Sequence, residues 1–267
     1  MLKLLVVGGG KMGEALLGGL LAAEWAKPDE VGVLEKLAAR RAELRASYPG
    51  VAIVDQVEAC EAAILAVKPN DMRLACEGFP AGAGRPGRVL SIAAGITLAA
   101  IEAGFAGGAL PAVVRAMPNT PALVGAGVAA IAGGSTATDA DLVWAEEILG
   151  SVGTVVRVTE PQLDAVTGLS GSGPAYVFLI AEALIEAGVL VGLARPIAEK
   201  LAIGTIAGAA ALMTNSDRSP ADLRGDVTSP GGTTAAGLRA LEDRAVRAAF
   251  LDAVSAATRR SAELGQA

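Results

Sequence analysis

Three glycines near the start of the chain have the spacing of a phosphate-binding turn. Gly8, Gly10 and Gly13 form the pattern G-x-G-x-x-G, between an apolar run at 2–7 and an Ala/Leu-rich stretch at 14–23. In a strand–turn–helix, the first glycine permits the tight turn, the second lets the backbone approach a pyrophosphate, and the third lets helix and strand pack closely. Amide groups at the helix start then face the phosphates. The pattern predicts a nicotinamide dinucleotide site; the alternative is a structural turn in an α/β domain.

The second predicted strand ends in an acidic residue that is followed by basic ones. Glu35, 22 residues after Gly13, can accept hydrogen bonds from an adenosine ribose diol, which favours NADH. Lys36, Arg40 and Arg41 follow at once and can neutralise the 2′-phosphate of NADPH. Alternatively, the two arginines belong to a solvated helix face. The sequence therefore leaves the choice between NADH and NADPH open.

Other strand ends supply candidate cofactor contacts on the same edge of a parallel sheet. Lys68 can face the dinucleotide from the run A-V-K-P at 66–69, where Pro69 terminates a strand. Small residues after the next strand, Ala94 among them, let a nicotinamide ring approach. Asn119 follows the strand after that, where it can hydrogen-bond either a ligand or the backbone of a turn.

Composition argues against several classes of function. The 267 residues carry a net charge of −6, and the few aromatic residues do not alternate with basic ones, so we expect no nucleic-acid surface. Without histidine and with only Cys60 and Cys76, the chain cannot assemble the usual transition-metal site. Two cysteines also fit a reducing compartment. The uncharged run at 201–216 is short for a membrane span, so we expect a soluble cytoplasmic protein that binds no membrane.

Apolar runs alternate with helix-compatible segments up to about Pro161. This pattern predicts a doubly wound, mostly parallel sheet with strands at 2–7, 31–34, 51–54, 62–67, 89–93 and 112–116. Two further runs, 127–132 and 154–158, flank a predicted helix at 138–150 and are expected to extend the sheet at one edge. Beyond Pro161 the sequence predicts helices with wide apolar stripes, at 176–191, 196–213 and 233–264.

We therefore predict a Rossmann-type α/β domain at 1–159 and an all-α domain at 160–267. Helices with such broad apolar faces, in so small a domain, need a covering surface from elsewhere. They predict a homodimer formed through the helical domain, either alone or assembled into a larger homo-oligomer.

Two loops in the second half of the chain are rich in hydroxyls and glycines. L-S-G-S-G-P-A-Y at 169–176 has the serine and proline of a helix start. V-T-S-P-G-G-T-T at 227–234 lies directly before a predicted helix, where free backbone amides bind anions. The second loop is a candidate site for a substrate carboxylate; the alternative is an interhelical turn with ordinary capping.

Five motifs together resemble the pyrroline-5-carboxylate reductase family from end to end of the chain. Besides the glycine pattern, they are A-V-K-P at 66–69, R-A-M-P-N-T-P at 115–121, L-D-A-V-T-G-L-S-G-S-G-P-A-Y at 163–176 and D-V-T-S-P-G-G-T-T at 226–234. The resemblance implies NADPH or NADH as cofactor and reduction of 1-pyrroline-5-carboxylate to L-proline, the last step of proline biosynthesis. It also implies that each active site lies between the cofactor domain of one subunit and helices involving the other.

The resemblance also implies individual site roles. Ser229, Gly231, Gly232 and Thr233 are expected to hold the substrate carboxylate, and Thr234 is expected to hydrogen-bond the ring nitrogen as the catalytic contact. The residues expected to line the dinucleotide are Gly8, Gly10, Lys11, Met12, Ala66, Val67, Lys68, Pro69 and Ala94. The stretch between the third and fourth predicted strands is more compact than in the family, so no contact is carried over there.

The absence of histidine fits the reduction of an imine. Carbonyl reductases commonly deliver a proton through His, Lys or Tyr. A cyclic iminium ion is already electrophilic and needs mainly orientation and a carboxylate anchor. The alternatives are a related imine reductase, a 3-hydroxyacid dehydrogenase and a non-catalytic redox sensor. The dehydrogenase family has a lysine on the first helix of its second domain, which 176–191 lacks, and a sensor does not need the loop at 227–234.

Overall fold

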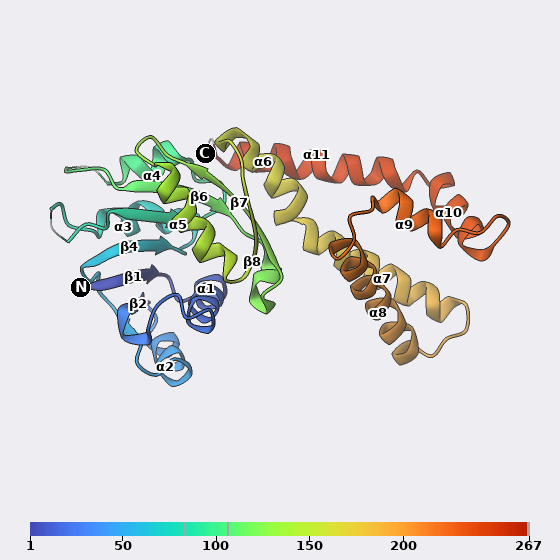
Figure 1. Ribbon diagram of the computed structural model, residues 1–267, viewed down its shortest axis with the longest axis horizontal. Helices are drawn as coiled ribbons and strands as arrows, with labels where there is room; N and C mark the ends of the chain where they lie inside the picture. Colours follow the sequence, from blue (N-terminus) through green and yellow to red (C-terminus); the bar gives the residue numbers. More distant parts are fainter. Residues whose placement is uncertain (83, 106, 266–267) are drawn as a thin grey trace. The chain divides into compact units, whose positions relative to one another are not determined.

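An eight-stranded sheet is the framework of the N-terminal part of the computed structural model, which describes residues 1–82, 84–105 and 107–265 (Figure 1). Its strands are β1 (Leu2–Val7), β2 (Val31–Leu34), β3 (Ala52–Val54), β4 (Cys60–Leu65), β5 (Arg88–Ser91), β6 (Ala112–Met117), β7 (Gly127–Gly133) and β8 (Gly153–Arg157). They are ordered β3-β2-β1-β4-β5-β6-β7-β8, with β1 to β6 parallel and β7 antiparallel to β6 and parallel to β8. The predicted doubly wound sheet with two added edge strands is confirmed.

Helices cover both faces of this sheet. They are α1 (Lys11–Ala22), α2 (Ala38–Ser47), α3 (Met72–Glu77), α4 (Leu98–Ala103) and α5 (Asp139–Gly150), with short 3₁₀ turns at Pro28–Glu30, Pro69–Asp71, Thr120–Val124 and Glu160–Gln162. Alternate residues of β1 divide between two buried clusters, because successive side chains of a strand point to opposite faces. Leu4 and Val6 pack with α1 and α5, whereas Leu5 and Val7 pack with α3 and α4.

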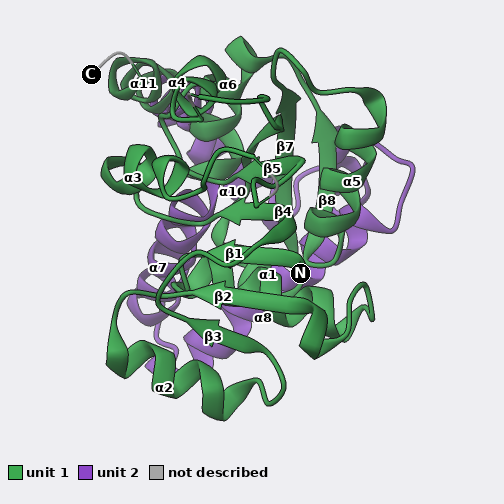
Figure 2. Ribbon diagram, turned by 90° about the vertical axis from the view of Figure 1, so that its left-hand side faces the viewer, with its two compact units in different colours: residues 1–172, 255–267 green, residues 173–254 purple. Residues whose placement is uncertain are grey.

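The chain forms two compact units, which Figure 2 shows in different colours. The first contains residues 1–172 and 255–267, and the second contains 173–254. The second unit is built from α7 (Gly173–Leu190), α8 (Arg195–Thr214), α9 (Pro220–Asp226), α10 (Thr233–Asp243) and the first part of α11 (Val246–Leu264). The last turns of α11 belong to the first unit, where Ser261 Oγ donates to Asp164 Oδ1 at 2.7 Å. A domain boundary after residue 159 stays a prediction, since contact units and folding domains need not coincide.

Two helical segments differ from the sequence-based expectations. The single helix predicted at 233–264 is broken at Ala245, whose φ is 53°, into α10 and α11. The loop predicted to start a helix at 169–176 is itself mostly helical. There α6 (Leu163–Val166) leads into a π-helical turn at Thr167–Gly171, and α7 begins at Gly173.

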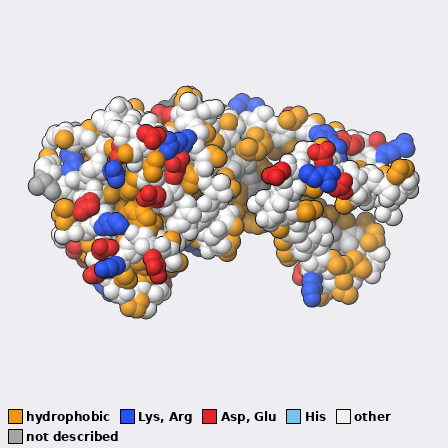
Figure 3. All heavy atoms as spheres, in the orientation of Figure 1, with side chains coloured by type: hydrophobic (Ala, Val, Ile, Leu, Met, Phe, Trp, Pro, Cys, Tyr) orange, Lys and Arg blue, Asp and Glu red, His pale blue; other side chains and the backbone are white. Residues whose placement is uncertain are grey.

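Apolar side chains lie exposed on α7 and α8, and Figure 3 shows hydrophobic atoms on the surface of this unit. Phe178 and Leu179 on α7 are 63% and 65% exposed. By length and composition alone, the stretches 160–190 and 195–214 are also apolar enough to cross a membrane. Large contiguous apolar surfaces mark sites of protein or membrane contact, so these faces need a covering surface.

Candidate functional site

The glycine pattern forms the turn between β1 and α1. Gly8 has a φ of +106°, and a Cβ there would lie 2.5 Å from the carbonyl oxygen of Ala66, so this position requires glycine. A Cβ at Gly13 would lie 2.1 Å from the carbonyl oxygen of Gly8. At Gly10, the N-cap of α1, no atom of the described residues lies within 4 Å of where a Cβ would stand. Gly8 and Gly13 therefore build the turn, and Gly10 leaves open space before α1.

This turn lies where the sheet order changes direction. β1 pairs with β2 on one side and with β4 on the other. In open α/β sheets, ligands bind at the carboxyl ends of the strands at such a switch point. The A-V-K-P run follows β4 at this edge, where the Ala66 amide donates to the carbonyl oxygen of Val7 at 2.8 Å and Lys68 and Pro69 are exposed.

The other predicted cofactor residues follow strands at the same carboxyl edge. Lys11, at the first position of α1, and Ala94, after β5, are exposed. Met12 and Val67 are half-buried and pack against the two core clusters. The fold thus brings the predicted cofactor residues to one edge of the sheet, around the glycine turn.

Glu35 follows β2 and is fixed by two backbone amides. Its Oε2 accepts a hydrogen bond from the amide of Gly9 at 3.0 Å, and its Oε1 accepts one from the amide of Leu37 at 2.8 Å. The carboxylate therefore stands beside the glycine turn, at the position where an acidic residue can bind a ribose diol. Lys36 is exposed, with its Nζ 3.9 Å from Asp71.

The two arginines after β2 are engaged within the protein. Arg40 Nε donates to the carbonyl oxygen of Gly9 at 2.8 Å, and its guanidinium also pairs with two glutamates. Arg41 donates to two backbone carbonyls and lies 3.5 Å from Asp55. The interpretation of these arginines as a solvated helix face is therefore wrong. Each guanidinium has five N–H donors, so these bonds do not use up the donors of either arginine.

Gly9 is a residue of this site that the sequence reasoning overlooked. Its amide binds Glu35, its carbonyl binds Arg40, and a Cβ on it would lie 2.6 Å from Leu44 Cδ1. Of the three consecutive glycines, the dinucleotide pattern requires Gly8 and Gly10 but not Gly9. The additional glycine at this position was the available signal. Gly9 joins the glycine turn to the residues that follow β2.

Asn119 lies after β6 and is buried, at 8% exposure. Its Oδ1 accepts a hydrogen bond from the Val128 amide at 2.8 Å, and its Nδ2 donates to the carbonyl oxygen of Ser170 at 3.1 Å. Of the two alternatives for this residue, the structure shows the backbone contact. A contact with the cofactor stays a prediction.

The hydroxyl-rich loop lies in the second unit and ends at the first turn of α10. Gly231 has a φ of +70°, which glycine adopts without strain, and the N-cap Gly232 donates its amide to the carbonyl oxygen of Ser229 at 3.0 Å. Within the described part of the chain, the hydroxyls of Ser229, Thr233 and Thr234 have no hydrogen-bond partner. The first amides of a helix also lack intrahelical partners. Such a set of donors suits an anion, for example a carboxylate.

Neither cysteine is available for nucleophilic chemistry. Cys60 and Cys76 are free and buried, and burial raises the pKa of the Cys60 thiol to about 12. Both thiols are therefore protonated at neutral pH. Over residues 1–82, 84–105 and 107–265, no cluster of three or more ligating side chains is arranged to hold a metal ion.

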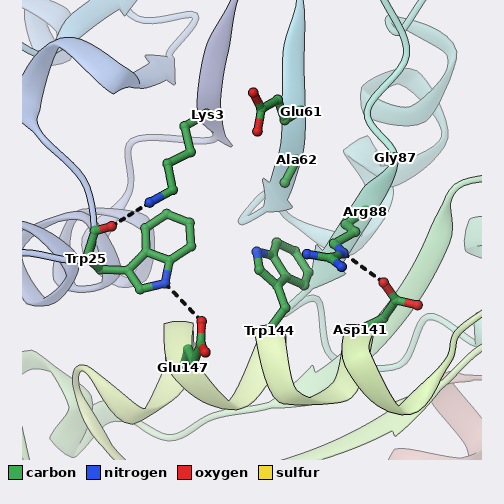
Figure 4. Close-up of a pocket in the computed structure, with 9 residues that line it drawn as sticks. All are labelled: Lys3, Trp25, Glu61, Ala62, Gly87, Arg88, Asp141, Trp144 and Glu147. Carbon is green, nitrogen blue, oxygen red and sulfur yellow. Dashed lines mark hydrogen bonds and ion pairs between the residues drawn. The ribbon is translucent and has the colours of Figure 1, made fainter.

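A hollow of about 480 Å³ lies at the opposite, amino edge of the sheet, beside α5 (Figure 4). Lys3 donates to the carbonyl oxygen of Trp25 at 2.6 Å, and Trp25 Nε1 donates to Glu147 at 3.3 Å. Arg88 Nε lies 2.8 Å from Asp141 Oδ1. Since most of its charged groups bond neighbouring residues, we interpret this hollow as a junction between the sheet and α5.

A Rossmann-type sheet with a glycine turn at its switch point, joined to a helical unit, defines a dinucleotide-binding oxidoreductase. Two protein-family models match the chain: "NADP oxidoreductase coenzyme F420-dependent" over residues 3–95, and "Pyrroline-5-carboxylate reductase dimerisation" over residues 160–264. The chain is 46% identical to the pyrroline-5-carboxylate reductase of Synechocystis sp., over 99% of both chains. It belongs to the pyrroline-5-carboxylate reductase family.

Solved structures of family members have the same fold over their full length. The pyrroline-5-carboxylate reductase of Coxiella burnetii superposes with a TM-score of 0.90 at 34% identity, covering 98% of both chains. The Plasmodium falciparum enzyme, solved with NADP bound, superposes with a TM-score of 0.84 at 29% identity, covering 99% of this chain and 98% of that one.

Proposed function

We propose that this chain reduces 1-pyrroline-5-carboxylate to L-proline with NADPH or NADH. The bound nicotinamide supplies the hydride, which adds to the carbon of the C=N bond. The observation that carries the proposal is the pairing, in one chain, of an open dinucleotide turn at Gly10 with a loop before α10 whose Ser and Thr hydroxyls at 229, 233 and 234 have no partner among the described residues. Full-length similarity to pyrroline-5-carboxylate reductases supports it, as does the NADP-bound relative.

The residues at the carboxyl edge of the sheet fit a dinucleotide. Open space at Gly10 admits a pyrophosphate to the first amides of α1, and the exposed Lys68 adds positive charge after β4. Ala94, small and exposed, allows a flat ring to approach β5. We expect Gly8, Lys11, Met12, Gly13, Glu35, Lys36, Ala66, Val67 and Pro69 to complete this site.

The loop before α10 fits the substrate's carboxylate and ring nitrogen. Amides of Gly231 and Thr233, together with the Ser229 hydroxyl, supply donors to the carboxylate, while Gly232, whose own amide donates to the Ser229 carbonyl, shapes the loop around it. The hydroxyl of Thr234 then accepts from or donates to the ring nitrogen and orients the C=N bond. Because an iminium ion brings its own proton from water, Thr234 serves orientation and is not an obligatory acid.

The exposed apolar faces of α7 and α8 fit a second copy of the chain. The matching family model over 160–264 describes a dimerisation region. Glu182 and Glu186 on α7 and Lys200 on α8 would each be expensive to place in lipid. We therefore propose a cytoplasmic homodimer, alone or within a larger homo-oligomer, with no membrane or nucleic-acid partner.

Oxidation of NADPH and NADH on addition of 1-pyrroline-5-carboxylate, followed by absorbance, tests this function.

In the same assay, Thr234→Ala should lower kcat/KM but leave residual turnover. The expected loss of transition-state stabilisation is roughly 1–3 kcal/mol, that of a lost hydrogen bond to a charged group. Ser229→Ala should act mainly on KM for the substrate. Thr154→Ala, at an exposed position of β8, is the matched control and should match the parent protein. Folded parent protein without turnover on either cofactor would refute the function.

A further inference from the structure

The chain passes from the first unit towards α7 through the π-helical turn at Thr167–Gly171. Here the amide of Ser172 donates to the carbonyl oxygen of Thr167 at 2.9 Å. The acceptor lies five residues before the donor, whereas in an α-helix it lies four residues before. Such turns add one residue to a helix, and they occur frequently at functional sites. The bonding of this turn therefore decides the register in which α7 begins.

Pro174 cannot supply the α-helical donor to one carbonyl of this turn. Proline has no amide hydrogen, so residue 174 cannot donate to the carbonyl four residues earlier, which is that of Ser170. Asn119 Nδ2 donates to that carbonyl instead, at 3.1 Å. The bond from the Val128 amide to Asn119 Oδ1, at 2.8 Å, fixes which way the buried Asn119 amide points.

Packing holds the same turn against the end of β6. A Cβ on Gly171 would lie 2.6 Å from Cε of Met117, the last residue of β6. Met117 and Asn119 thus contact consecutive residues of the turn, Gly171 and Ser170. Because β6 is parallel to β1, both contacts arise at the carboxyl edge of the sheet, where the glycine turn also lies.

We propose that Asn119 is a positioning residue for the reduction. By binding the carbonyl of Ser170, it fixes the turn from which α7 begins, and α7 carries the apolar face proposed to bind the second copy. This inference rests on the proposed function, in which the cofactor edge of one copy and helices involving the other serve one hydride transfer. Hydride transfer depends steeply on the separation of the reacting atoms, so a looser turn lowers kcat.

Asn119→Asp removes the donor to Ser170 and keeps the acceptor for Val128. We expect kcat to fall about tenfold, as for loss of one hydrogen bond, while the dissociation constants for NADPH and NADH stay within about twofold of the parent values. Dinucleotide fluorescence titration gives the constants. Weakened dinucleotide binding with unchanged kcat would make Asn119 a cofactor contact and overturn the proposal.

Pro174→Ala supplies the amide that the turn lacks. In the double variant Asn119→Asp/Pro174→Ala, the carbonyl of Ser170 can accept from residue 174. We expect kcat to recover at least about threefold relative to Asn119→Asp, a non-additive effect that only coupled residues show. Additive losses in the double variant would overturn the proposal.

Gly171→Val disturbs the same turn without removing a polar group. It provides a second test of the positioning role if Asn119→Asp does not fold. The added side chain meets Met117, so we expect reduced kcat with unchanged dinucleotide affinity. Gly150→Val at the end of α5 is the matched control, because a Cβ there meets no described atom within 4 Å. A parent protein without turnover refutes the proposed function itself. Parent-like kcat in a folded Asn119→Asp or Gly171→Val variant refutes only the positioning role.

Discussion

Gly8 and Gly10 belong to one pattern but meet different surroundings. A side chain at Gly8 would overlap the backbone of Ala66, whereas Gly10 faces open space and has a φ of −69° that any residue adopts. We therefore expect Gly10→Val to keep a melting temperature close to that of the parent while weakening NADPH and NADH binding at least about tenfold, because its side chain fills the pyrophosphate space. Gly150→Val controls for the substitution itself. Parent-like dinucleotide affinity in Gly10→Val would mean that the turn is structural only.

Glu35 is the residue on which cofactor preference should depend. Its carboxylate lies beside Gly9, where the proposed site predicts that it repels the 2′-phosphate of NADPH. Glu35→Gln removes the charge and keeps one oxygen for the Gly9 amide. It should shift the ratio of kcat/KM for NADPH over NADH upward by roughly tenfold to hundredfold. Glu58→Gln, at an exposed position, should leave the ratio unchanged. If the ratio does not move in Glu35→Gln either, the carboxylate does not face the ribose.

At the scale of elements, Asp141 ties the start of α5 to β5. Its Oδ2 accepts from the amide and hydroxyl of Thr138 at 2.8 and 2.6 Å, and its Oδ1 accepts from Arg88 at 2.8 Å. Burial disfavours the charged carboxylate, but the bonds from Thr138 and Arg88 outweigh burial and lower the pKa of Asp141. A carboxyl whose pKa falls on folding stabilises the fold above its unfolded pKa, about 4, and loses this effect as pH falls through the folded value.

Asp141→Asn should accordingly lower the free energy of unfolding at neutral pH by about 1–2 kcal/mol, the usual effect of losing a helix cap. The difference from the parent should begin to shrink below about pH 4 and should disappear as pH falls through the lowered pKa of the folded parent, where its carboxyl also becomes neutral. Urea denaturation across a pH series measures both effects, with Glu58→Gln as the control. A deficit that stays constant down to the lowest pH would contradict this role of Asp141.

The elements differ in how far the sequence predicts them. β1 was predictable because a strand buried on both faces reads as a near-continuous apolar run, interrupted in Leu2–Val7 by Lys3, and the strand matches the predicted range. α9 was missed although Ser219 and Asp222 form a capping box around Pro220, a readable signal. The π-helical turn had no local signal, and the Ser170 carbonyl within it is bound by Asn119, far away in the sequence.

The residues of the candidate site also differ in how far the sequence predicts them. The geometry of the glycine turn follows from the spacing of its glycines, because sterics alone demand it at Gly8 and Gly13. The ribose-facing position of Glu35 and the anchoring roles of Ser229 and Thr234 stay predictions. They depend on where a ligand lies, which neither the spacing of residues nor backbone geometry determines.

At the scale of the whole molecule, the apolar face of α7 should hold two copies together. Leu179→Glu places a charge on this face, and Leu74→Glu on α3 is the matched control, since the two leucines are 65% and 56% exposed. Sedimentation should show Leu179→Glu as a monomer with little turnover, because the proposed site needs helices from a second copy. Leu74→Glu should sediment like the parent. An oligomeric Leu179→Glu would place the interface elsewhere.

Hydride transfer to the carbon of the C=N bond is the step that makes this chain a reductase of 1-pyrroline-5-carboxylate. Turnover with NADPH or NADH carrying deuterium at the transferable position, followed by mass spectrometry and NMR of the product, tests that step directly. The expected product is proline with one deuterium on the ring carbon that was double-bonded to nitrogen. Proline without deuterium, or no proline from folded protein, would contradict it.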